Sequence, residues 1–149
     1  MILTLAHIGA KPSGEWAKLT DEYIKRLGAY TEAGALCFKT EAALVEWLGK
    51  QKTAPVLVLM DGRGKQVSSE GLAEFIGGLR ERGARQLVFA IGPADGWKLD
   101  LMSSTVGQKP LMISLGPMTL AHALARLVMA EQIYRAFTIL AGHPYHSGH

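Results

Sequence analysis

The sequence has one cysteine, no long apolar run and no basic leader, and each absence excludes a class of protein. A single cysteine, Cys37 among 149 residues, excludes a disulfide framework within the chain and fits a reducing compartment. No window approaches the roughly 18 uninterrupted apolar residues of a membrane span. The apolar start at Met1 to Leu5 lacks the charged region of a signal peptide. We therefore expect a cytoplasmic protein with no membrane partner.

Charge and metal-ligating residues are also sparse. The net charge of +3 and the pI of about 9.1 permit nucleic-acid binding without demanding it. Cys37 stands alone, and the histidines near the end lack carboxylate neighbours, so we expect no metal site. Cys37 lies within an apolar run and is predicted to be a small buried core residue. Among the scattered basic residues, Arg63 and Lys65 follow a predicted strand, where they could meet phosphate.

Short apolar runs alternate with amphipathic segments along the whole chain. Strands are predicted at residues 2–8, 35–38, 56–60, 87–91 and 111–115. Helices are predicted from about Glu15, over 41–50, from Ser68 or Ser69, over 97–103 and over 120–140. Continuous apolar strands with intervening helices indicate an α/β fold, with a mainly parallel sheet of about five strands flanked by helices. Without linkers or repeats, 149 residues favour a single domain over residues 1–149.

Two helices carry apolar stripes whose members predict their buried faces. The first has Trp16, Leu19, Tyr23 and Leu27 on one face. The last has Leu120, Leu124, Leu127, Val128 and Phe137, with Thr119 placed to cap its start.

Three predicted strands end in glycine-containing loops, at residues 60–64, 92–96 and 115–120. Ligands bind at the carboxyl ends of parallel strands, and glycine lets the backbone approach a ligand closely. The chain lacks both the dinucleotide fingerprint and the P-loop. Met60, Leu115, Met118 and Leu120 suit an apolar planar group such as adenine. The alternative is that these glycines only form turns.

The last helix and the tail beyond it hold the remaining polar candidates. Glu131 and Arg135 are spaced for a helix-surface ion pair, or Glu131 interrupts the stripe to hold Arg135 or a partner subunit. His122 is interpreted as a surface residue. The tail contains His143, Tyr145 and His146, side chains that stack on bases and contact their edges, although chain ends usually fray.

Several motifs resemble one known family. They are the run from Ser114 to His122, the run from Glu131 to Phe137, and the ending His143-Pro144-Tyr145-His146, together with His7 to Lys11 and Ile91 to Gly96. Over essentially the whole chain they are similar to the ribosomal RNA large-subunit methyltransferase H family. This resemblance implies a SPOUT-type fold with a C-terminal trefoil knot. It also implies methylation of N3 of a pseudouridine in 23S rRNA, with S-adenosylmethionine as the cofactor.

The resemblance also implies roles for particular residues. It places the cofactor at Met60, Gly92, Leu115, Gly116, Pro117, Met118, Thr119 and Leu120. It places the RNA at His143, Tyr145, His146 and Arg135. His143 or His146 could then take the proton from N3, and Arg135 could stabilise the resulting anion. Two departures from the family pattern are Pro93, which lacks the amide hydrogen of the usual glycine, and the ending Ser147-Gly148-His149.

The expected partners are 23S rRNA in the ribosome and a second copy of the chain. A chain of this size, with a small site and a mild charge, is poorly suited to grip a folded RNA alone, which favours a homodimer through the last helix and the cofactor loops. The alternative function is a non-enzymatic RNA-binding or ribosome-associated α/β module. A nucleotide-binding enzyme of another kind is disfavoured by the missing phosphate motifs. Binding of S-adenosylmethionine would separate these alternatives.

Overall fold

The structure is a computed structural model that describes residues 1–98 and 110–148. Its elements are β1 (Ile2–Ile8), α1 (Gly14–Leu27), β2 (Glu32–Phe38), α2 (Glu41–Gly49), β3 (Val56–Gln66), α3 (Ser69–Glu81), β4 (Gln86–Ile91), β5 (Leu111–Ser114) and α5 (His122–Leu140). The strands pair in the order β2-β1-β4-β3-β5, and all four pairings are parallel. The predicted α/β fold with five parallel strands is confirmed.

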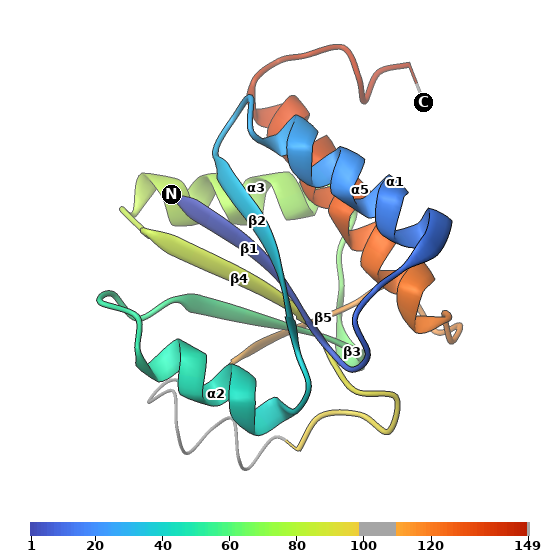
Figure 1. The fold of residues 1–149 in the computed structure, drawn as a ribbon. Helices are drawn as coiled ribbons and strands as arrows, with labels where there is room; N and C mark the ends of the chain where they lie inside the picture. The colour runs from blue at the N-terminus through green and yellow to red at the C-terminus, as the bar shows by residue number, and fades with distance from the viewer. Residues whose placement is uncertain (99–109, 149) are drawn as a thin grey trace.

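Helices cover both faces of the sheet (Figure 1). Helices α1, α3 and α5 lie on one face, and α2 lies on the other. The predicted helix over residues 97–103 falls almost entirely outside the described residues. The connection from β4 to β5 does so as well, so the trefoil knot stays a prediction. No helix within residues 1–98 or 110–148 is long and apolar enough to cross a membrane.

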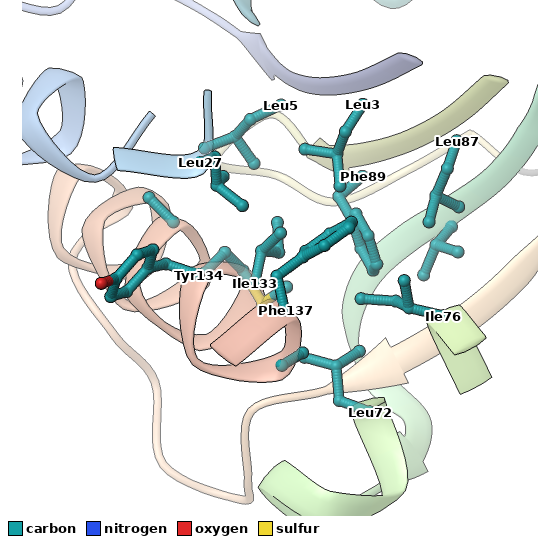
Figure 2. Packing of buried hydrophobic residues seen from close by; sticks show 14 of the residues in the cluster. Leu3, Leu5, Leu27, Leu72, Ile76, Leu87, Phe89, Ile133, Tyr134 and Phe137 are labelled. Atoms are coloured by element: carbon teal, nitrogen blue, oxygen red, sulfur yellow. The ribbon is translucent and has the colours of Figure 1, made fainter. Parts of the chain in front are cut away.

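Each strand divides its apolar side chains between two cores because successive residues point to opposite faces. In β4, Leu87, Phe89 and Ile91 join the core beneath α1, α3 and α5. Val88 and Ala90 join the core beneath α2. Figure 2 shows the larger core, where residues such as Phe89 meet Ile133 and Phe137 of α5. Burial on both faces explains why the strands read as continuous apolar runs.

Strand β3 is longer than the sequence predicted. The expected loop at residues 61–65 belongs to the strand, whose pairing with β5 shifts register between Met60 and Lys65. Glycine makes this irregularity possible. A Cβ at Gly64 would lie 2.7 Å from the backbone nitrogen of Ile113. The two backbones therefore approach too closely for any side chain at position 64.

The predicted buried face of α1 is wrong at its first two members. Trp16 and Leu19 are 48% and 49% exposed, whereas Leu27 is fully buried. The first turns of α1 border a pocket instead of the core. The buried contact with α5 begins further along α1, where the Tyr23 ring lies 5.8 Å from that of Tyr134.

The predicted stripe of α5 is correct at Phe137 and wrong at its start. Leu124, Leu127 and Val128 are only half-buried, and the buried stripe runs through Met129, Ala130, Ile133, Ala136 and Phe137. Thr119 does not cap the helix, which begins at His122 after Ala121 with no side-chain cap. The residues after β5 stay non-helical around a pocket, so the helix and its stripe start later than expected.

Cys37 is exposed, which overturns its prediction as a core residue. Strand β2 is an edge strand, and the burial pattern of its residues shows none that is fully buried. The thiol donates to the carbonyl oxygen of Gly9 at 3.4 Å. An apolar run therefore did not imply burial at the edge of this sheet.

The close approach at Gly64 leads to a stability prediction. Gly64→Ala should destabilise the fold by about 2–3 kcal/mol, because the added methyl group meets backbone that cannot rotate away. Gly62→Ala is the matched control on the same strand, since a Cβ there meets nothing within 4 Å. Urea denaturation of both variants measures the difference. Equal stabilities for the two would contradict the packing described here.

Candidate functional site

A pocket of about 300 Å³ lies at the carboxyl ends of β3, β4 and β5. Its lining includes all eight predicted cofactor residues: Met60, Gly92, Leu115, Gly116, Pro117, Met118, Thr119 and Leu120. Parallel strands end at the same edge of a sheet, which is where ligands bind in open α/β folds. Met60 and Leu115 are 55 residues apart in the sequence, yet both line this pocket.

The turn after β5 is held by its own polar groups. The Ser114 hydroxyl accepts a hydrogen bond from the Gly116 amide and donates one to the Gly116 carbonyl, both at 3.1 Å. Gly116 has a φ of 122°, a conformation that only glycine adopts without strain. Met118, two residues further on, is 80% exposed. The turn therefore presents backbone groups and an uncovered apolar side chain at the rim.

The Trp97 side chain lines the pocket and supports its wall, a role that was not predicted from the sequence. Its indole N–H donates to the Met60 carbonyl at 3.1 Å. A Cβ at Gly92 would lie 2.6 Å from the Trp97 ring, so glycine at 92 is required by this packing. The next residue, Lys98, donates its amide to the Glu41 carboxylate at 3.1 Å, which ties the loop to α2. The apolar tryptophan after a glycine loop was the available signal.

Two histidines that were not singled out as site residues connect the pocket to β1. The carbonyl oxygen of Gly92 can only accept, so His122 donates to it from Nε2. The Nδ1 atom of His122 then accepts from Nε2 of His7 at 2.9 Å, and Nδ1 of His7 faces the Cys37 thiol at 3.6 Å. These partners assign neutral imidazoles with the proton on Nε2. The interpretation of His122 as a mere surface residue is wrong.

Burial keeps His7 neutral. Burial, the largest cause, acts together with the neighbouring His122 and Arg126 to lower the pKa of His7 from 6.5 to about 4. The side chain is 5% exposed. A positive charge there would leave Nε2 donating to His122, but it would put a second proton on Nδ1, which could then no longer accept from the Cys37 thiol.

Arg63, expected to meet phosphate, is already paired. Its side chain donates from Nε and Nη2 to the two Asp61 oxygens, each at 2.9 Å. These hydrogen bonds lower the pKa of Asp61. Asp61 itself lines the pocket and was another residue that the sequence analysis missed. The bidentate pair offers the pocket little unbalanced charge.

In the middle of α5, the Glu131 carboxylate accepts four hydrogen bonds. Its Oε1 accepts from Nε and Nη2 of Arg135 at 3.0 and 2.6 Å and from the Tyr145 hydroxyl at 3.0 Å. Its Oε2 accepts from Gln132 at 2.8 Å. The Glu131 and Arg135 side chains are 19% and 12% exposed, so this is more than a surface pair. Of the alternatives for Glu131, the structure shows that it holds Arg135.

The tail is docked and not frayed. Nδ1 of His146 accepts from Arg135 at 3.1 Å, and its Nε2 donates to Glu70 at 2.7 Å. The Tyr145 ring packs edge-on against Tyr134 at 4.9 Å, and burial raises the pKa of its hydroxyl. Tyr145 borders the core, which corrects the expectation that a chain end this polar lies free. His143, by contrast, is exposed.

The two groups of candidate residues lie along different parts of α5. The pocket includes His122 and Ala125 from the helix start, whereas the tail follows Leu140 and folds back to the middle of the helix, where the Tyr145 hydroxyl donates to Glu131. Glu131 is nine residues beyond His122, which corresponds to about 14 Å along the helix. Figure 1 shows the C-terminal tail well away from the ends of β3 and β5. No group of three potential metal ligands occurs in the described part of the chain.

The neutral state of His7 predicts a pH dependence of stability. Its folded pKa of about 4 lies below the ordinary 6.5, so between these values the unfolded chain binds more protons. The contribution of neutral His7 to the free energy of unfolding should be fully present above about pH 6.5. It should fall by about 2 kcal/mol towards pH 4, after allowance for solvent screening. Urea denaturation across this range should show a shallower slope for His7→Gln. His143→Gln, in the exposed tail, is the control, and equal slopes for all three proteins would contradict the assignment.

Comparisons with known proteins agree with this geometry. The sequence profile described as "Predicted SPOUT methyltransferase" matches residues 1–146. The chain is 48% identical over 150 residues to Ribosomal RNA large subunit methyltransferase H of Koribacter versatilis, with 100% of both chains covered. It is 45% identical over 130 residues to the protein of the same name from Deinococcus radiodurans, with 86% of each covered.

A solved structure supports the fold alone. The crystal structure of a Ribosomal RNA small subunit methyltransferase E from Neisseria gonorrhoeae, bound to S-adenosyl methionine, is similar with a TM-score of 0.51 and 16% identity. The similarity covers 93% of this chain and 66% of that one. Sequence profile, full-length relatives and fold thus agree with the motifs. The chain belongs to the SPOUT methyltransferase family, and within it to the ribosomal RNA large subunit methyltransferases H.

Proposed function

We propose that this single-domain protein uses S-adenosylmethionine to methylate N3 of a pseudouridine in 23S rRNA of the ribosome, in the cytoplasm. The observation that carries this is the pocket where β3, β4 and β5 end, because it gathers all eight residues that the family motifs assign to the cofactor. The full-length relatives named as ribosomal RNA large subunit methyltransferases support the same substrate class.

The pocket suits the cofactor in chemistry as well as position. Apolar side chains of Ile91, Leu115 and Leu120 line it, as an adenine ring requires, and backbone groups from the glycine turns supply directional hydrogen bonds. Pro93 contributes no amide donor, so Gly92 and the turn at Gly116 carry this role. When bound, S-adenosylmethionine supplies an activated methyl group. The residues of the chain then have to align the acceptor base and exclude water.

A second copy of the chain has to complete the site. Arg135 lies 13 residues beyond His122 on α5, about 20 Å along the helix from the cofactor pocket, and Tyr145 and His146 pack beside this second half of the helix. His143 is on the same tail. Two copies with their last helices antiparallel would bring the tail of one to the pocket of the other. We therefore propose a homodimer through α5 and the cofactor loops.

Uncovered apolar side chains lie where this dimer needs them. Leu115 and Met118 are 38% and 80% exposed at the pocket rim. Leu124, Leu127 and Val128 are half-buried on α5 although they belong to its apolar stripe. Exposed apolar groups gathered at one end of a helix mark interaction surfaces. Contact with a second copy would cover them.

In this arrangement Arg135, His146 and His143 have different roles. Arg135 carries the positive charge that would stabilise the anion formed when N3 loses its proton. His146 uses both ring nitrogens, one towards Arg135 and one towards Glu70, so it orients Arg135 in this conformation. His143 accepts from the Tyr145 amide through Nδ1 at 3.1 Å and presents Nε2 outwards. His143 is therefore the better placed of the two to contact the acceptor base.

Mixing two inactive variants tests the composite site. Gly116→Val, with a branched side chain at a φ of 122°, should abolish cofactor binding while the tail stays intact. The double variant His143→Ala with His146→Ala should lose about 10²-fold in methyl transfer while its pocket stays intact. Random reassociation of equal amounts should restore about a quarter of the wild-type sites, because half of the dimers are mixed and each has one complete site.

Three measurements accompany the mixing experiment. Methyl transfer to ribosomes gives the activity, sedimentation velocity gives the dimer, and calorimetric titration with S-adenosylmethionine checks each variant alone. A mixture as inactive as its components, with mixed dimers present, would contradict the composite site. Failure of the wild-type protein to bind S-adenosylmethionine would instead favour the non-enzymatic RNA-binding module.

A further inference from the structure

A second cavity, the α1–α5 pocket, lies between the first turn of α1 and the start of α5. It has a volume of about 190 Å³ and is lined by His7, Ala10, Pro12, Ser13, Trp16, Ala17, His122, Ala123 and Arg126. His122 also lines the cofactor pocket, so the two cavities share this side chain. None of the eight cofactor residues or the tail residues named above lines the α1–α5 pocket.

Arg126 makes this pocket unusual. It is only 7% exposed, and its Nε has no hydrogen-bond partner. None of the ion pairs found within residues 1–98 and 110–148 includes Arg126. Burial lowers its pKa, whereas the charges of Asp21 and Cys37 raise it. A buried guanidinium without a directly paired carboxylate is costly, which indicates that an anion from outside the chain completes it.

The start of α1 adds a second group of donors. Ser13 is the N-cap residue, and its side chain makes no capping hydrogen bond, so amides of the first turn keep their donors. The helix has 14 residues, and its N-terminus favours negative charge. The acidic residue of that turn, Glu15, is directed to Lys18 at 3.4 Å. Ser13 and Arg126 line the same pocket, so the uncapped first turn of α1 and the guanidinium border one space.

Trp16 supplies a surface for a base. Its indole lines the same pocket and is 48% exposed. Exposed aromatic rings beside cationic groups bind single-stranded nucleic acid by stacking on bases while the phosphates are neutralised. A phosphate next to an aromatic face matches one nucleotide of an RNA strand.

We propose that the α1–α5 pocket binds a nucleotide of the RNA next to the target base, with the phosphate on Arg126 and the N-terminus of α1 and the base on Trp16. This inference rests on the proposed function, because it places the substrate strand at the rim of the cofactor pocket. His122 lines both pockets, so the bound nucleotide and the methyl donor would lie on either side of it.

Titration with uridine 5′-monophosphate tests the site without any methyl transfer. Quenching of tryptophan fluorescence should report binding, and Trp16→Phe should remove the signal because Trp97 is buried and Trp47 lies on α2. Arg126→Gln should weaken binding about tenfold, as expected for loss of a charged hydrogen-bonded contact. Uridine, which lacks the phosphate, should bind both proteins equally weakly. Arg82→Gln, an exposed arginine after α3, is the control and should change nothing.

Thermal melting and oligomeric state complete the test. Arg126→Gln should melt no lower than the wild type, because it removes a buried charge that the chain leaves unpaired. If the variant melts markedly lower, the arginine is structural and the proposal is wrong. Trp16→Ala provides a second test, because an exposed indole can be removed without unfolding the protein. This variant should bind uridine 5′-monophosphate more weakly but bind inorganic phosphate as the wild type does.

Two further outcomes would overturn the proposal. Equal affinity of wild type and Arg126→Gln for uridine 5′-monophosphate would show that the pocket holds no phosphate. Dissociation of a dimer by Arg126→Gln, with nucleotide affinity unchanged, would assign Arg126 to a carboxylate of a second copy instead. Because none of these measurements uses S-adenosylmethionine, failure here leaves the methyltransferase proposal standing.

Discussion

The parallel direction of all five strands is the constraint on which the rest of this structure depends. It places the ends of β3, β4 and β5 at one edge, where their loops close a single pocket. The same constraint sends α5 back along the sheet, and the tail that follows it packs beside the second half of this helix. The separation of pocket and tail within one chain is the reason for proposing that two copies combine them.

Close packing around the pocket depends on the absence of side chains at two positions. Gly64 lets β3 bulge against β5, and Gly92 makes room for the Trp97 ring. At both positions the cost of a methyl group comes from a neighbouring atom and not from the glycine's own backbone angle. Gly116 is different, because its positive φ and not a neighbour excludes other residues.

In the described part of the chain, two buried side-chain atoms lack a hydrogen-bond partner, Oε1 of Glu41 and Nε of Arg126. The other oxygen of Glu41 accepts from the Lys98 amide. Glu131 satisfies Arg135 and Tyr145, and His7 and His122 satisfy one another. Both networks hold their members neutral or balanced at low dielectric, where they are strong. Arg126 is buried in the described structure without such a partner. That contrast points to a ligand for Arg126, whereas Arg63 beside Asp61 needs none.

The sequence by itself determined the α/β class and the five strands, and the family motifs in it identified eight residues that line the pocket. It could do so because strand burial and glycine loops are local patterns. Only the tertiary structure decided which face of α1 and the start of α5 is covered, that Cys37 lies on an edge strand, and that β3 continues through its glycines. It also decided that His7, His122 and Gly92 meet, since those contacts join segments 30 to 115 residues apart. Periodicity describes a segment, but the neighbour that covers it is set by packing across the whole chain.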